Sequence, residues 1–227
     1  MRKNTLILLA ISLFLIQITV LAAVPTAKVI DGIKARFEKI QDFKSDIKQI
    51  QLDGIGTKTV FQGEIYYKKP YQIRMNYMDT QKNTPTHIAI TDSKTLWQYT
   101  AELKQVTRQK FDPNSLPLPL LILGSASKID DQFREKNYIK PIERVTLDKK
   151  SVFQIIVKPK NGNKEYKEQT LWVSTDTYLP YKAELKYNQG NVATIFFTNI
   201  KTNVGIEDSK FVMEKMNGVK VVDMVEK

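Results

Sequence analysis

From residue 43 to residue 200, this chain of 227 residues is dominated by short runs in which polar and apolar residues alternate. In the first run, Phe43–Gln49, the charged residues occupy every second position. Nine further runs have the same period: Thr59–Lys69, Tyr71–Asp79, Thr86–Thr91, Thr95–Tyr99, Gln105–Phe111, Val152–Lys158, Glu168–Ser174, Tyr181–Tyr187 and Val192–Ile200. Each run is bounded by Gly, Pro, Asp or Asn, and Asn161-Gly162 and Gln189–Asn191 are hairpin signals. Because no helical pattern alternates with the runs, the sequence predicts an antiparallel meander of about ten strands.

One amphipathic helix precedes the strands. From Thr26 to about Gln41, apolar residues recur at helical spacing with charged residues between them. These apolar residues are Val29, Ile30, Ile33, Phe37 and Ile40. We therefore expect this helix to bury one face.

The segment Leu116–Leu123 separates two series of strands and is apolar apart from Pro117 and Pro119. Proline lacks the N–H that a central strand needs, so a strand is not expected here. The pattern predicts a short helix that begins near Pro119 and a second helix over Ser127–Glu135. On composition alone, two interpretations remain open: a fixed plug over one end of the sheet, or a movable apolar lid.

The N-terminus has the pattern of a secretory signal peptide. Arg2 and Lys3 precede an uncharged, largely apolar run from Leu6 to Val24, and Ala22 and Ala23 offer a cleavage site. An uncleaved membrane anchor is the competing interpretation, because the run nearly reaches the length that spans a bilayer. Cleavage is favoured, since no cationic stop-transfer segment follows the run.

The chain contains no cysteine. Disulfides, thiolate metal sites, cysteine nucleophiles and the lipid-bearing cysteine of a lipoprotein are therefore excluded. Removal of the leader, residues 1–23, leaves residues 24–227, which are enough for a single domain with a substantial core. The formal net charge of +11 favours anionic membrane headgroups or acidic proteins as partners, because an exported protein rarely meets nucleic acid.

A catalytic centre is hard to assemble from this sequence. The only histidine, His87, lies in a strand-like run without an acidic neighbour. Asp130 and Asp131 point in different directions on a predicted helix. We find no nucleophile elbow, phosphate-binding glycine loop or metal-ligand spacing. The sequence therefore predicts no catalytic residue, no metal ion and no cofactor, and favours a binder of apolar ligands.

Four stretches of the chain carry the motifs of one family. Phe61–Pro70 resembles a Gly-x-Leu-x-Val-Lys-Arg-Pro signature, and Asp92–Tyr99 is similar to a Ser-Asp-Gly-Lys-Thr-Leu-Trp-x-Tyr strand pair. Phe43–Gln49 resembles the opening strand of that family, and Phe211–Asp223 resembles its C-terminal end. On these motifs the chain resembles the LolA family, the periplasmic carriers of outer-membrane lipoproteins. The resemblance extends over essentially all of the chain after the leader.

The resemblance implies a mainly β fold of the α+β class. It is an unclosed antiparallel β-barrel, or half-barrel, covered by the N-terminal helix and a central helical lid, with a cavity for acyl chains. The implied cavity residues are Phe61, Ile65, Tyr67, Ile73, Met75, Ile88, Ile90 and Leu96. The implied lid residues are Ile33, Phe37, Leu116, Leu118, Leu120, Leu121 and Leu123.

Lys69 stands where the family signature has arginine before the proline. The resemblance implies that this residue holds the lid closed by hydrogen bonds. Lysine offers a point charge and not the planar fork of arginine. We therefore expect a weaker or differently built latch, whose removal alters cargo release more than cargo uptake.

The function implied by the resemblance is that of a periplasmic chaperone and not of an enzyme. It would receive acylated lipoproteins from an inner-membrane lipoprotein-releasing ABC transporter and pass them to an outer-membrane lipoprotein acceptor, as a monomer and without nucleic acid. A carrier of free lipid or glycolipid and a regulator of the same fold that senses lipoproteins remain as alternatives. A lipid hydrolase is disfavoured because no nucleophile or base is evident.

Overall fold

The computed structural model describes residues 24–79, 84–113, 116, 120, 129, 131–162 and 166–224. The helices within them are α1 (Thr26–Glu38), α3 (Asp131–Lys136) and the 3-10 helix η3 (Asp208–Phe211). The strands are β1 (Asp42–Leu52), β2 (Lys58–Lys68), β3 (Gln72–Asp79), β4 (Thr84–Asp92), β5 (Thr95–Thr100), β6 (Gln105–Lys110), β7 (Asn137–Ile139), β8 (Glu143–Leu147), β9 (Lys150–Pro159), β10 (Tyr166–Ser174), β11 (Pro180–Tyr187), β12 (Val192–Thr202) and β13 (Lys220–Asp223).

Three of the predicted features lie wholly or largely outside these residues. They are the leader, residues 1–23, the short helix that begins near Pro119, and the lid residues Leu118, Leu121 and Leu123. Within the described ranges, no helix is both long enough and apolar enough to cross a membrane.

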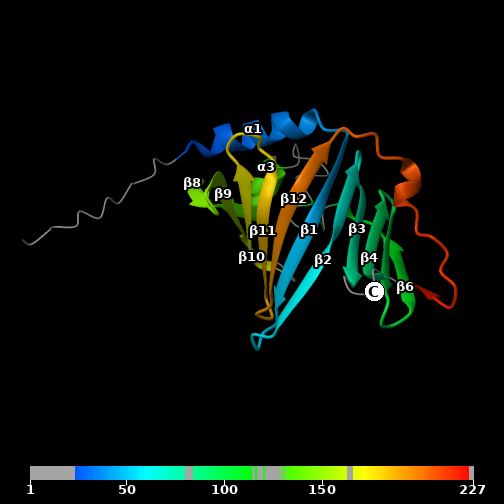
Figure 1. Cartoon of the computed structure of the whole chain (residues 1–227). Coiled ribbons are helices and arrows are strands. Elements are labelled where there is room, and N and C mark those ends of the chain that lie inside the picture. Colours follow the sequence, from blue (N-terminus) through cyan, green and yellow to red (C-terminus); the bar gives the residue numbers. More distant parts are fainter. Residues whose placement is uncertain are drawn as a thin grey trace, which may run out of the picture.

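The described strands form one curved sheet that does not close (Figure 1). Its order is β13-β6-β5-β4-β3-β2-β1-β12-β11-β10-β9-β7, and β8 also pairs with β9. Neighbouring strands are antiparallel except for β13, which runs parallel to β6. The predicted unclosed antiparallel barrel is thus confirmed, with one parallel strand at its edge. The strands that the alternating runs did not predict, β7, β8 and β13, are too short to show a clear period.

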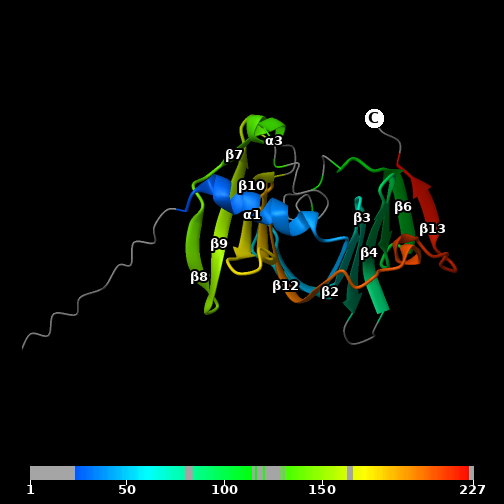
Figure 2. The same ribbon diagram turned by 90° about the horizontal axis from the view of Figure 1, so that it is seen from above.

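Seen from above, the sheet is a trough with two arms (Figure 2). We call β9–β12 the covered arm, because α1 lies across its concave side. We call β4–β6 with β13 the open arm, because α1 does not extend over it. The floor between the two arms consists of β1, β2 and β3.

The helix α1 forms because its apolar side chains recur every three or four residues and so share one face. Its buried residues are Val29, Ile30, Ile33 and Phe37. It ends at Glu38, earlier than predicted, where the N–H of Lys39 turns back to carbonyl oxygens of the last turn. Ile40, beyond the helix end, is still fully buried. The predicted amphipathic helix is therefore confirmed with a shorter C-terminal end.

Two contacts fix α1 over the sheet. Gly32 lies against the ring of Tyr178, from the turn between β10 and β11, and a Cβ at Gly32 would lie 2.4 Å from a ring carbon. A larger residue would therefore push this ring away. After the end of the helix, the side chain of Asn203 accepts a hydrogen bond from the N–H of Gln41 at 2.7 Å and donates to the carbonyl of Lys39 at 3.0 Å. The helix is thus tied to the covered arm and to the end of β12.

After β12 the chain crosses to the convex side of the open arm, and we call residues 203–219, which lead to β13, the C-terminal strap (Figure 1). The carboxylate of Asp42, only 5% exposed, accepts hydrogen bonds from the backbone N–H groups of residues 204–206 at 2.7, 2.8 and 3.2 Å. A buried carboxylate is stable only with such partners. The strap therefore leaves the sheet in a defined direction.

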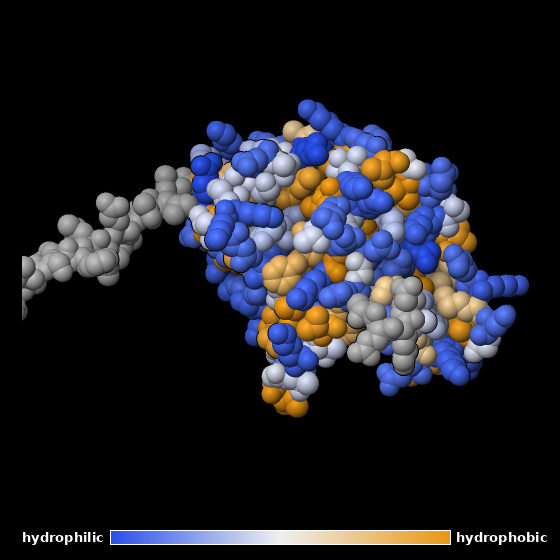
Figure 3. All heavy atoms as spheres, in the orientation of Figure 1, coloured by the Kyte–Doolittle hydropathy of each residue, from blue (hydrophilic) through white to orange (hydrophobic). Residues whose placement is uncertain are grey.

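The rest of the convex face differs from the part under the strap. Figure 3 shows this face, where hydrophilic side chains predominate and hydrophobic ones form separate patches. On the covered arm, Glu168 is paired with Lys186 at 2.7 Å and with Lys158 at 3.1 Å. The hydrogen bond from Lys186 lowers the pKa of the Glu168 carboxyl, so the pair is ionised at neutral pH. The convex face of the covered arm is thus a charged, solvated surface.

Candidate functional site

Four of the predicted cavity residues come together on the concave side. Residues directly opposite in an antiparallel pair share a face. Ile65 lies opposite Met75, and Tyr67 lies opposite Ile73. Ile65, Tyr67 and Ile73 are buried in the core that α1 covers, and Met75 is partly buried against it. The floor of the trough thus presents an apolar surface to α1.

The predicted lid residues that the structure describes meet the same surface. Ile33 and Phe37 project from α1 and belong to the buried core. Leu116 and Leu120 are partly buried and pack against that core. Apolar side chains from two separate parts of the chain therefore cover the concave face.

The covered arm continues this apolar surface. Ile155, Leu171, Ala183 and Ile195 lie opposite one another from β9 to β12, and they form one row across the arm. All four are buried under α1. The next member of the row, Gln49 of β1, is polar. This row therefore becomes polar at β1, whereas the rows through Ile65 and Tyr67 stay apolar across β2 and β3.

The glycine of the predicted signature has a structural role in the floor. A Cβ at Gly63 would lie 1.8 Å from the carbonyl oxygen of Asn76 on β3. No side chain fits at that distance, and glycine in a strand often marks such a close approach of two backbones. Gly63 therefore lets β2 and β3 approach each other closely.

The concave face changes from apolar to polar between β3 and β4. Three rows of opposite residues cross from β1 to β6, and each becomes more polar in the open arm. The rows are Phe43, Tyr67, Ile73, Thr91, Leu96, Gln109; then Ser45, Ile65, Met75, Ala89, Gln98, Thr107; and then Ile47, Gly63, Tyr77, His87, Thr100, Gln105. The predicted cavity residue Leu96 thus lies on the concave side, but outside the core under α1.

Ile88 and Ile90 require a correction. They lie opposite Asn76 and Arg74 of β3, which point to the convex side. There they pack against Phe211 of the C-terminal strap. The prediction that Ile90 lines the concave cavity is wrong, whereas Ile88 packs against Phe211 and also lines the groove on the concave side of the open arm. Alternation of apolar and polar residues does not show which face of a strand is buried. The sequence also contained no sign that the strap covers the convex face of β4.

A groove of about 480 Å³ lies along the concave side of the open arm. Phe61, a predicted cavity residue, lines it together with Tyr77. The described residues that line it are Gln49, Gln51, Phe61, Tyr77, His87, Ile88, Ala89, Gln98, Tyr99, Thr100, Thr107, Gln109 and Met224. The polar residues of this groove were not predicted from the sequence, because polar residues in alternating strands usually face water. The available signal was that glutamine and threonine, and not lysine and glutamate, occupy these positions.

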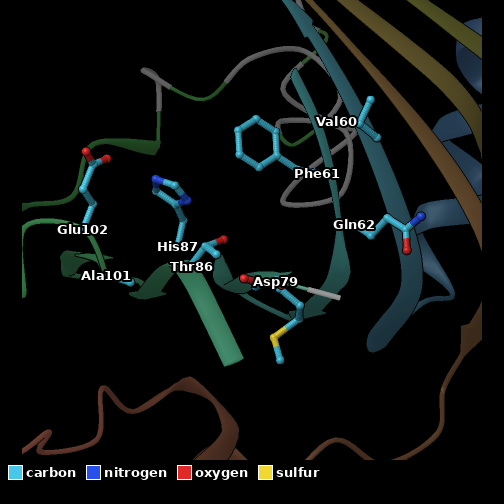
Figure 4. A pocket seen from close by; sticks show the side chains of 9 residues that line it. Val60, Phe61, Gln62, Asp79, Thr86, His87, Ala101 and Glu102 are labelled. Carbon is cyan, nitrogen blue, oxygen red and sulfur yellow. The ribbon is translucent and has the colours of Figure 1, made fainter. Parts of the chain in front are cut away.

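A second hollow, of about 550 Å³, adjoins the groove and shares Phe61 and His87 with it. Figure 4 shows these two side chains pointing into the same space from β2 and β4, whereas Val60 and Gln62 lie on the other side of β2. The two rings meet edge to face with their centroids 5.8 Å apart. His87 is therefore held by packing against an aromatic ring.

Tyr77 marks the boundary between the apolar and polar parts of the concave face. It packs against the core under α1, and its ring lies edge-on to Phe61 with centroids 5.7 Å apart. Its hydroxyl donates a hydrogen bond to Oε1 of Gln49 at 2.5 Å. Burial raises the pKa of the Tyr77 hydroxyl, so this group remains a donor and orients the amide of Gln49.

Lys69, the predicted latch, contacts the C-terminal end of α1. Its Nζ donates a hydrogen bond to the carbonyl of Glu38, the last residue of α1, at 2.8 Å. A cation is favourable at the negative end of a helix dipole. The neighbouring Lys68 reaches the opposite face, where its Nζ binds the carbonyl of Ile206 at 2.8 Å and the carboxylate of Asp208 at 2.6 Å. The role of Lys69 in cargo release stays a prediction.

Among the residues that the structure describes, no group of three His, Asp or Glu side chains is arranged to hold a metal ion. What the described site offers is an apolar surface under α1 and, beside it, a groove of amides, hydroxyls and aromatic rings. These groups can bind hydrocarbon and uncharged polar groups.

Comparison with known proteins places the chain in a family. Residues 38–214 match the sequence model of the family described as outer membrane lipoprotein carrier protein LolA. The outer-membrane lipoprotein carrier protein of Bordetella avium (strain 197N) is 25% identical over 212 residues, which cover 91% of this chain and 95% of the relative. The protein of the same name from Pseudomonas aeruginosa (strain UCBPP-PA14) is 26% identical over 188 residues, which cover 81% of this chain and 82% of the relative.

A solved structure shares the fold. An uncharacterized conserved protein from Thermus thermophilus superposes with a TM-score of 0.54 and 8% sequence identity. The superposition covers 87% of this chain and 98% of that protein.

Proposed function

Because the chain belongs to the LolA family of outer membrane lipoprotein carrier proteins, we propose that it carries lipoproteins through the periplasm. The acyl chains of the cargo would lie between α1 and the concave face of the sheet. The observation that supports this most is the continuous apolar surface from β9 to β3, whose cover is a helix together with Leu116 and Leu120. A second sheet would make a fixed core, whereas a single helix can be displaced.

The energetics suit a carrier that has to release its cargo. Each methylene removed from water contributes about 0.8 kcal/mol, so an acylated protein needs an apolar site to cross an aqueous compartment. In this structure Ile33 and Phe37 occupy the concave side. Loading would replace their contacts with the sheet by contacts of acyl chains. The net free energy gained when acyl chains enter the site would therefore be smaller than the free energy gained by moving them from water into an empty apolar site.

The proposed route begins at an inner-membrane lipoprotein-releasing ABC transporter and ends at an outer-membrane lipoprotein acceptor. The sequence has no phosphate-binding glycine loop with which the chain could bind and hydrolyse a nucleotide. Loading would therefore depend on the transporter, and unloading would depend on a higher affinity of the acceptor. The leader, residues 1–23, supports a periplasmic location after cleavage near Ala22 or Ala23.

Mass spectrometry of the native protein tests this proposal. The protein would be purified without detergent from the periplasm of its own cells, together with a periplasmic protein of similar size and charge as the background control. We expect acylated polypeptides to copurify with the carrier and not with the control. Free phospholipid or glycolipid without any acylated polypeptide would contradict the proposal and favour a carrier of free lipid.

A further inference from the structure

We propose that the groove on the concave side of the open arm binds the polypeptide that follows the acylated residue of the cargo. It would do so through hydrogen bonds to backbone amides, and it would thereby select acylated polypeptide over anionic phospholipid. This inference rests on the proposed carrier function, and it adds a second subsite beside the acyl site.

The groove has free groups that match a peptide backbone. Gln51, Gln98 and Gln109 line it, and within the described part of the chain their side chains make no hydrogen bond. Each amide offers two donor hydrogens and one acceptor oxygen. A peptide group presents one N–H donor and one carbonyl acceptor. One glutamine side chain can therefore accept a hydrogen bond from the N–H and donate one to the carbonyl. The hydroxyl of Thr100 adds a further donor and acceptor in the same groove.

The charge of the lining does not favour an anionic headgroup in the groove, although a third hollow that shares Gln109 and Met224 with it is lined by Lys94, Arg108 and Lys110. The chain contains 35 lysines and arginines, yet none of the described residues that line the groove or the adjoining hollow is a lysine or an arginine. Phosphate groups are bound in proteins mainly by these two cations and by clustered backbone N–H groups. The adjoining hollow contains Asp79 and Glu102, which would repel a phosphate. Uncharged amides are the polar groups that fit both hollows.

The groove lies where the polar end of the cargo would emerge. Tyr77 packs against the apolar core on one side and lines the groove on the other. Acyl chains held under α1 would therefore leave their linkage to the polypeptide close to Tyr77 and Phe61. The groove volume of about 480 Å³ lies within the range of specific ligand sites. A short extended segment of polypeptide would thus follow the open arm away from α1.

Binding assays with three matched lipids test the inference. The first probe is a cysteine that carries an N-acyl chain and an S-diacylglyceryl group, followed by four serines. The second is the same lipidated cysteine capped as a primary amide, and the third is phosphatidylglycerol. Each competes against a fluorescent fatty acid for the full mature protein. The test variant is Gln98→Leu with Gln109→Leu. The control is Gln154→Leu, on the convex side of β9 opposite Trp172.

We expect the wild-type protein to prefer the lipopeptide to both other probes. The double variant should lose roughly tenfold to a hundredfold in affinity for the lipopeptide, as two lost hydrogen bonds imply. Its affinity for the capped cysteine should stay unchanged, and the Gln154 variant should behave as wild type. That unchanged affinity also shows that the double variant is folded.

Other results would separate the two proposals. Equal wild-type affinity for the lipopeptide and the capped cysteine, or for the lipopeptide and phosphatidylglycerol, would overturn the inference alone. An equal loss of affinity for lipopeptide and capped cysteine in the double variant would also overturn it. A wild-type protein that binds none of the acylated compounds would overturn the carrier function itself.

Discussion

The covered arm and the open arm of the sheet bury their apolar side chains on opposite faces. In the covered arm an apolar row faces α1, and the convex side presents Glu168 in ion pairs with lysines. In the open arm Ile88 and Ile90 face the convex side under the C-terminal strap. On the concave side of that arm, glutamine and threonine side chains line the groove. One continuous sheet therefore offers two neighbouring environments on its concave side.

This difference indicates how one fold can hold an amphipathic cargo. A trough that was apolar throughout would suit a free hydrocarbon chain but would leave the polar end of a lipoprotein without partners. The switch of faces between β3 and β4 places hydrogen-bonding groups beside the apolar surface. It also gives each arm its own cover, with α1 on the concave side of one arm and the strap on the convex side of the other.

The largest expected effect comes from the covered arm. Phe153 of β9 is 4% exposed, belongs to the core under α1 and stacks on Tyr178 with ring centroids 5.9 Å apart. Phe153→Ala should lower the free energy of unfolding by about 3 to 5 kcal/mol, since the large core around it cannot collapse into the space. Urea unfolding followed by circular dichroism measures this. A loss below about 1 kcal/mol would break the comparison, because the core under α1 would then not stabilise the fold.

The matched substitution in the open arm should cost less. Phe211 of η3 is 2% exposed, but among the described residues its cluster contains two other buried members, Ile88 and Ile90. The strap can close partly over the space left by Phe211→Ala, so we expect a loss of about 2 to 3 kcal/mol. Hydrogen exchange should speed up in β6 and β13 while α1 keeps its protection. Equal loss of protection in α1 would show that the two arms do not have separate covers.

The smallest change in stability should come from substitution of the two neighbouring lysines. Lys69 contacts the end of α1, and Lys68 contacts the C-terminal strap. Lys69→Leu removes the hydrogen bond to Glu38 that favours the closed position of α1. The open, loaded form is then relatively more stable, so transfer of a fluorescent lipopeptide to the acceptor should slow about twofold to tenfold, with uptake little changed. Lys68→Leu is the control, because it loosens only the strap. Unchanged transfer by the Lys69 variant would mean that this residue is not a latch.

Much of the fold could be predicted because local patterns carry it. The alternation of apolar and polar residues determined the strands, and hairpin signals such as Asn161-Gly162 determined their antiparallel order. The spacing of Ile33 and Phe37 determined that one face of α1 is buried. Gly63 and Lys69 could be singled out from the signature stretch, although their contacts with Asn76 and Glu38 could not.

Only the tertiary structure decided which face of β4 is the apolar one. A strand pattern of period two is symmetric, so the sequence of β4 is equally compatible with either orientation. The choice depends on what covers each face. For Ile88 and Ile90 the cover is Phe211, which comes from the distant end of the chain. What the sequence by itself determined was the strands with alternating residues, β1–β6 and β9–β12, and the buried face of α1. The split of the concave side into an apolar and a polar part arose from long-range packing.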